Sequence, residues 1–156
     1  MATFTPKNED LILANDLNLW ITSGETDVVV AYATSVSVSI SSDSIDTSNK
    51  MSPRWAMFLA GSASYEVSTE ALYTRNDAVI GYDWLMEKMV AGDAISWKMG
   101  TKVAAENDYT LDTAKPYYTG KAVITSLSLS AGNNEVASCS ATLTGTGAIA
   151  LNKAGA

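Results

Sequence analysis

The chain has 156 residues, of which 47% are hydrophobic and only 17% are charged, and its 17 acids against 10 bases give a net charge of −7. This length fits one domain with a real core, and the acidic balance without any basic cluster disfavours attraction to nucleic acid. Because the chain has no His, it lacks the usual general base and the commonest transition-metal ligand.

The single cysteine, Cys139, cannot form an internal disulfide, which excludes a small secreted disulfide scaffold. The first ten residues lack the apolar stretch of a secretory signal, and no apolar run predicts a membrane helix. We therefore expect one domain over residues 1–156, folded in a reducing cytoplasm, with residues 1–13 as an N-terminal arm.

The first half of the chain predicts strands. Residues 17–22 alternate weakly, and residues 26–33 are apolar on both faces, as in a strand covered on both sides. Residues 34–41 (TSVSVSIS) place Val and Ile on one face and Ser on the other, which predicts a half-buried strand.

Residues 42–53 (SDSIDTSNKMSP) are a cluster of turn formers too long for a tight hairpin. We expect residues 42–60 to project from the body as a loop. Alternation returns after Gly61, and in residues 64–73 the polar face carries Glu66 and Glu70.

The second half predicts the one convincing helix, over residues 77–92, followed by a strand over residues 94–100 and an irregular polar excursion over residues 101–120. A closing hairpin is predicted, with strands at residues 121–130 and 135–144. Residues 145–156 are small and are expected to form a C-terminal tail.

Four of the predicted strands share a face of small hydroxylated residues, and the only charges on it are two glutamates. An ordinary solvent-facing sandwich would show the same alternation, although such sheets usually carry charges of both signs. The candidate functional residues on this face are Ser37, Ser39, Ser64, Glu66, Ser68, Glu70, Ser126, Ser128, Ser138 and Ser140.

No catalytic, metal or cofactor site is predicted. Cys139 lies on the apolar side of a strand and has no His partner. The loop acids lack the spacing of a calcium loop, although Asp108 and Asp112 leave a glycosidase formally open. The four tryptophans lie in apolar contexts without interleaved bases, which favours core or subunit contact over base stacking.

With these segments in order, the sequence resembles the major tail tube proteins of long-tailed (siphovirus-type) bacteriophages. The resemblance covers residues 34–147 and rests on the stretch TSVSVSISSDSIDTSNK, the following SYEVSTEALYT, and the closing GKAVITSLSLSAGNNEVASCSATLTGTG. It implies a mainly β fold, an antiparallel β-sandwich or partly open barrel with one flanking α-helix.

The resemblance also implies a non-enzymatic virion protein that forms hexameric rings, which stack into a hollow tail tube for DNA ejection. The hydroxylated face would line the lumen, where Glu66 and Glu70 would repel phosphates so that DNA passes without specific binding. The implied partners are copies of the chain and the tape measure, tail terminator and distal tail proteins.

The projecting segment at residues 42–60 is expected to reach a neighbouring subunit or the next ring. Its expected contacts are Asp43, Asp46, Lys50, Arg54 and Trp55. The alternative is a β-sandwich adhesion or fibre module that binds a host surface glycan or protein through exposed tryptophans and the excursion at residues 101–120.

Overall fold

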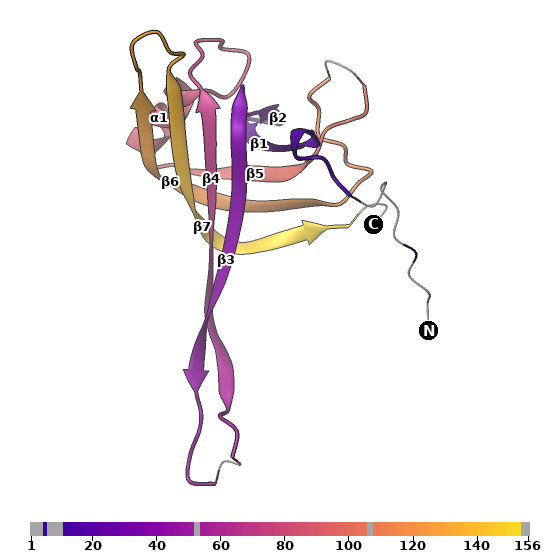
Figure 1. Cartoon of the computed structure of the whole chain (residues 1–156), viewed down its shortest axis with the longest axis vertical. Coiled ribbons are helices and arrows are strands. Elements are labelled where there is room, and N and C mark those ends of the chain that lie inside the picture. Colours follow the sequence, from indigo (N-terminus) through magenta and orange to yellow (C-terminus); the bar gives the residue numbers. More distant parts are fainter. Residues whose placement is uncertain (1–4, 6–10, 52–53, 106–107, 154–156) are drawn as a thin grey trace.

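The structure, a computed structural model, describes residue 5 and residues 11–51, 54–105 and 108–153. Its described part contains one antiparallel sheet of seven strands in the order β2-β1-β5-β6-β7-β4-β3 (Figure 1). The strands are β1 (Leu17–Ser23), β2 (Thr26–Val29), β3 (Ala33–Asp46), β4 (Phe58–Leu72), β5 (Ala94–Thr101), β6 (Tyr117–Ser130) and β7 (Ser138–Asn152).

A short 3₁₀ helix, η2 (Ala14–Asp16), precedes β1, and the α-helix α1 (Tyr82–Ala91) connects β4 to β5. The expected mainly β class with one flanking helix is confirmed. The two layers of the expected sandwich belong to a single sheet that bends over itself without closing into a barrel. No helix in the described residues is long and apolar enough to cross a membrane.

The sheet bends along β6 and β7, where the pairing register shifts between Thr119 and Lys121 and again between Ile124 and Ser126. Tyr65 of β4 packs into this corner: its ring lies against Gly145, and its hydroxyl donates a hydrogen bond to the Lys121 carbonyl. Below the corner β5, β6 and the end of β7 run across the direction of β3 and β4 (Figure 1).

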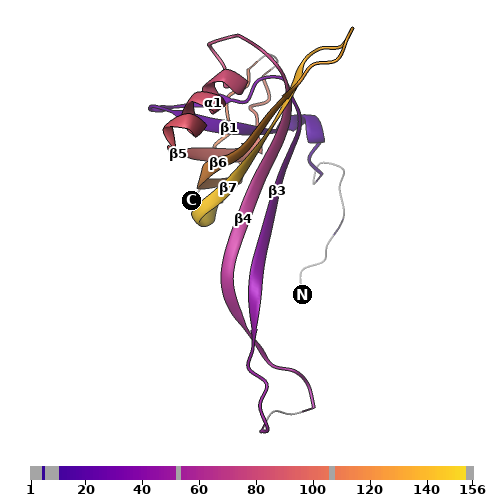
Figure 2. The ribbon, with the colours of Figure 1, turned by 90° about the vertical axis from the view of Figure 1, so that its left-hand side faces the viewer.

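The core lies inside the bend. Leu19, Trp97, Val67 and Leu143 are fully buried, and they come from strands β1, β5, β4 and β7. Figure 2 shows α1, β1 and β5 on the same side of the β3–β4 ribbon. From α1, Leu85 packs into this core and is 3% exposed.

Helix α1 begins at Tyr82, five residues later than expected, because the preceding segment makes other contacts. The Asn76 side chain accepts a hydrogen bond from the Ala78 amide, and Ile80 bridges to Val30 in parallel. The predicted end is confirmed: Gly92 adopts the left-handed conformation that caps the helix.

The segment at residues 42–60, expected as a loop throughout, is a two-stranded ribbon at both of its ends. β3 continues to Asp46 and β4 already begins at Phe58, so that only residues 47–57 connect them. The alternation in sequence ends near residue 41 because the ribbon leaves the core and both of its faces become exposed.

Residues 145–152, expected as part of a tail, instead continue β7, and they pair with β6 between Tyr117 and Ala122. Strand pairing uses backbone groups, so small side chains did not reveal it. Residues 11–13 of the expected N-terminal arm expose their side chains, while most of residues 1–10, and residues 154–156 at the other end, lie outside the described residues.

Candidate functional site

The four predicted hydroxylated strands lie next to one another as β3, β4, β7 and β6. Their registers form rows across the sheet: Ser37 pairs with Ser68, Ser68 with Thr142, and Thr142 with Ser126. The next row runs from Ser35 through Glu70 and Ser140 to Ser128. The structure thus brings the predicted residues onto one continuous surface on the side of the sheet away from the core.

We call this surface the hydroxyl face. Its residues are Ser35, Ser37, Ser39, Ser41, Ser64, Glu66, Ser68, Glu70, Thr125, Ser126, Ser128, Ser130, Ser138, Ser140, Thr142 and Thr144. Thr125 was missed from sequence because a bulge between Ile124 and Ser126 turns it to the same side as Ser126.

Hydroxyl groups on this face bond to one another across the strands. The Oγ atoms of Ser37 and Ser68 are 2.6 Å apart, and the Oγ1 atoms of Thr125 and Thr144 are 3.1 Å apart. Ser128 and Ser140 are also hydrogen-bonded. Such pairs satisfy part of the hydroxyl groups' bonding capacity within the sheet and offer a phosphate no cationic partner.

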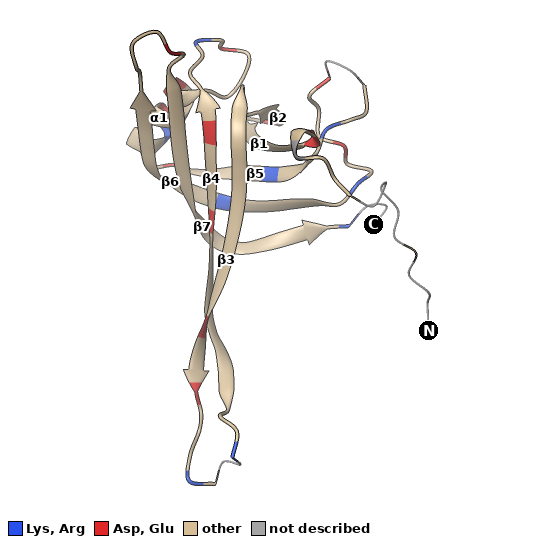
Figure 3. Ribbon diagram, in the orientation of Figure 1, with Lys and Arg blue, Asp and Glu red and all other residues tan. Residues whose placement is uncertain are grey.

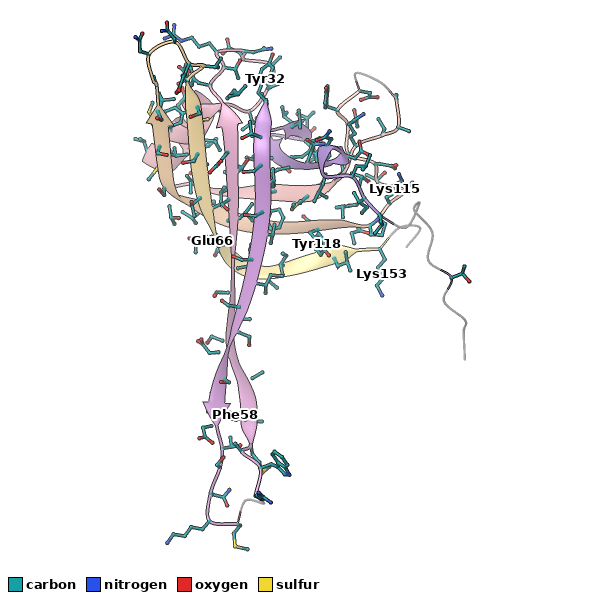
Figure 4. All side chains as sticks on the ribbon, viewed as in Figure 1. Tyr32, Phe58, Glu66, Lys115, Tyr118 and Lys153 are labelled. Atoms are coloured by element: carbon teal, nitrogen blue, oxygen red, sulfur yellow. The ribbon has the colours of Figure 1, made fainter. Side chains whose placement is uncertain are left out.

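The only charges on the hydroxyl face are the two glutamates, which are both exposed on β4 (Figures 3 and 4). Lys121 on β6 is exposed and lies just outside the hydroxyl face, on the same side of the sheet. It points away from the core because Ala122 and Ile124, which face the other way, are buried. Sequence reasoning missed Lys121, although its alternation with Ala122 and Ile124 is the signal that places it.

The part of the sheet formed by β2, β1 and β5 carries a balanced pair of charges. Lys98 donates to Asp27 at 2.6 Å, and the Thr22 hydroxyl donates to the same carboxylate at 2.7 Å. Burial raises the pKa of Asp27, but these hydrogen bonds outweigh burial and hold the pKa below its usual 3.8.

Two strand edges next to the hydroxyl face have no strand partner among the described residues. The outer side of β3 is one edge of the sheet, and β6 pairs with β5 only as far as Val123. An exposed edge of 14 residues such as β3 is a template for pairing with another chain.

The β3–β4 ribbon projects far from the body and ends in the loop at residues 47–57 (Figure 1). The predicted contact residues Asp43, Asp46, Lys50, Arg54 and Trp55 all lie on this projection and are exposed. The loop carries its own hydrogen bonds, since the Thr47 amide donates to the Met57 carbonyl and the Ser48 hydroxyl accepts from the Met57 amide.

Asp46 is part of this internal bonding. Its carboxylate accepts hydrogen bonds from the backbone and the side chain of Ser48, which lowers its pKa below 3.8. Large apolar side chains remain exposed nearby, with Trp55 at 79% and Phe58 at 58%.

Of the three remaining tryptophans, Trp20 and Trp97 are buried and Trp84 on α1 is half-buried. The Trp20 indole donates to the Tyr109 carbonyl at 2.7 Å, which ties Tyr109, in the segment between β5 and β6, to β1. The pKa of the half-buried Cys139 thiol is raised by burial, as for an unreactive core residue. No group of three or more potential metal ligands gathers within the described ranges.

The family described as "Phage tail tube protein" matches residues 17–150, which is most of the chain. No curated protein matches the chain as a relative.

Several solved structures share the fold. The chain resembles the tail of an empty gene transfer agent particle, solved with C6 symmetry, at a TM-score of 0.71 and 17% identity, over 90% of this chain and 98% of that one. The SPP1 tail tube gives a TM-score of 0.71 at 16% identity, over 92% and 80% of the two chains. An extracellular contractile injection system in its sheath-tube complex gives 0.63 at 12% identity, over 96% and 99%.

Proposed function

The chain belongs to the phage tail tube protein family and is a structural tube protein, and we propose that its copies form stacked hexameric rings whose hydroxyl faces line the channel for DNA. The observation that carries this proposal is the continuous hydroxyl face across four neighbouring strands. The C6 symmetry of the gene transfer agent tail supports the hexameric number. The role is structural and involves no catalytic step.

The chemistry of the hydroxyl face suits a channel that DNA must cross quickly. Protein that neutralises phosphates with Lys or Arg binds DNA more tightly, whereas paired hydroxyl groups and carboxylates do not. Glu66 and Glu70, repeated around a ring, would give the wall a negative potential, and a low-dielectric cylinder focuses that potential inside it. DNA would then pass with little friction and without specific contacts.

The two free edges explain how copies would join within a ring. β3 and β6 run in opposite directions, because β3, β4, β7 and β6 pair antiparallel in succession. Placing β3 of one copy beside β6 of the next therefore continues the antiparallel alternation around the lumen. Closure of the ring would leave none of these edges exposed.

The projecting ribbon would join rings along the tube axis. Contacts between rings are head to tail, and such contacts can extend without limit until another protein stops them. We assign Asp43, Asp46, Lys50, Arg54 and Trp55 to this contact because they lie on the projection.

Tail terminator and distal tail proteins would then cap the two ends of the tube, and a tape measure protein would occupy its lumen. The protein would fold in the host cytoplasm and become part of the virion tail. The adhesion alternative is not favoured, since Trp20 and Trp97 are buried and the family match is to tail tubes.

Electron cryomicroscopy of the concentrated, purified protein tests the proposal. We expect tubes of uniform bore in which Glu66 and Glu70 face the lumen and β3 lies beside β6 of the neighbouring copy. Discrete particles, or a tube with either glutamate on its outer surface, would contradict it.

A further inference from the structure

A cavity of about 740 Å³ opens where the bent sheet fails to close, between β1 and β2 on one side and the start of β3 on the other. Its floor includes Val30, which is 4% exposed, and its mouth includes Tyr32, which is 63% exposed. Cavities of this size exceed the voids left inside a packed core and are typical of sites that bind another molecule.

Tyr32 has an unusual backbone conformation for a bulky residue, with φ of 51°. It is held there by β4 and by the segment before α1, since the Leu72 amide donates to the Tyr32 carbonyl and the Ala31 amide donates to the Ile80 carbonyl. Strained backbone of this kind concentrates at binding sites, where the surrounding structure maintains it.

The loop at the far end of the β3–β4 ribbon exposes large apolar side chains. Trp55, Met57 and Phe58 are all exposed there, so that the ribbon ends in an apolar knob. Figure 4 shows Tyr32 at one end of the molecule and Phe58 near the other, along its longest axis. A knob and a cavity at opposite ends of one chain are what a head-to-tail repeat requires.

The charges of the two ends are also complementary. Residues 47–57 contain Lys50 and Arg54, and the one acid adjacent to them in sequence is Asp46, whose carboxylate is hydrogen-bonded to Ser48, so bases outnumber acids at this end. The cavity lining carries no charge, and acids outnumber bases beside it. The acids adjacent to lining residues in sequence or across a strand pair are Asp16, Glu70, Asp77 and Asp108, and the bases near them are Arg75 and Lys102.

We propose that the cavity between β1–β2 and the start of β3 receives the Trp55–Phe58 knob of a copy in the adjacent ring. This inference rests on the proposed tube and adds the receptor for its axial contact. The aromatic rings of one copy would fill the open seam of the next, and the cationic loop would lie against its acidic rim. The knobs of one ring would thereby fill the cavities that the unclosed sheets leave in the next ring.

The test uses cross-linking between two single-cysteine variants of the full chain, both in a Cys139→Ala background. One carries Met57→Cys within the knob, and the other carries Ala33→Cys in the cavity lining. Two controls carry Val136→Cys, in the turn between β6 and β7, or Val90→Cys on α1; these positions are 67% and 83% exposed. The knob variant is mixed with each of the other three, assembled, and treated with a short bismaleimide.

We expect a cross-linked dimer with Ala33→Cys and none with either control. Tubes that form but cross-link through Val136→Cys or Val90→Cys, or that give no dimer with Ala33→Cys, overturn the inference and leave the proposed function standing. If the wild-type protein forms no tubes, both fail.

Two further variants test the contact without cross-linking. Trp55→Ala should raise the concentration of free protein left beside tubes by at least about tenfold, because a large aromatic side chain loses its burial. Ala33→Trp should fill the cavity and abolish tubes, whereas Val136→Trp should leave them unchanged. Normal assembly of Trp55→Ala or of Ala33→Trp, with circular dichroism matching the wild type, overturns the inference.

Discussion

Gly145 is the position at which one added methyl group should most disturb the corner of the sheet. The Cβ of an alanine there would stand 2.5 Å from Cε2 of Tyr65, closer than side chains approach. The Tyr65 ring cannot retreat easily, because it is enclosed on its other sides. Its hydroxyl oxygen lies so close to Gly120 that a Cβ there would be only 2.6 Å away, and the centroids of the Tyr65 and Trp97 rings are 5.7 Å apart. Tyr65 itself is 5% exposed.

The cost of Gly145→Ala follows from these contacts. Overpacking of a core typically costs about 1–3 kcal/mol. Displacing the ring also endangers the hydrogen bond from Tyr65 to the Lys121 carbonyl, which adds about 1 kcal/mol. The total, roughly 2–4 kcal/mol, corresponds to a fall in melting temperature of about 4–16 °C for a domain of this size.

Thermal and urea unfolding of the monomer, followed by circular dichroism, measure this change. The matched control is the same substitution in a Tyr65→Leu background. Without the ring, alanine should be neutral or stabilise by about 0.4–1 kcal/mol, because Gly145 does not have the positive φ that would strain it. An equal cost in both backgrounds, or a cost below about 0.5 kcal/mol in the wild type, would refute the role of the Tyr65 ring.

Three further outcomes are expected. Tubes of the Glu66→Lys, Glu70→Lys double variant should retain DNA at low salt in co-sedimentation, whereas tubes with Glu87→Lys on α1 should not; equal retention would count against a luminal hydroxyl face. The pKa of Asp27 is lowered, so its stabilising contribution is complete above about pH 4 and is lost as the pH falls through the lowered pKa. Asp27→Asn should therefore unfold less steeply with acid than the wild type, and parallel acid titrations would contradict this. Trp20→Phe removes the hydrogen bond to Tyr109, should cost about 1 kcal/mol, and should speed proteolysis at residues 104–105; an unchanged cleavage rate would show that this bond does not hold the segment.

The local alternation of side chains in the sequence was enough to predict several strands and the faces that they expose. The Ser and Val alternation of residues 34–41 and the Glu66 and Glu70 pattern correctly predicted which side chains turn away from the core. The signal is strong because side chains of a strand alternate between its faces, so that a half-buried strand records its environment in its own residues. The helix end at Gly92 was readable for a similar local reason.

Features made by contacts between distant segments were not readable. The sequence assigned hydroxylated faces to separate strands, but only the register of β3, β4, β7 and β6 joins them into one surface. The small residues at 145–152 gave no sign that they pair with β6. Backbone pairing depends on which strands become neighbours and leaves little trace in either strand.

The cavity is the clearest case of a feature that tertiary structure alone decides. It exists because β2 is short and β3 turns away at Tyr32, which leaves the bent sheet unclosed. The apolar residues of that region read as two covered faces of one strand, because sequence records that a residue avoids water but does not record what covers it. Whether the covering atoms belong to the same chain is determined only when the strands have taken their places.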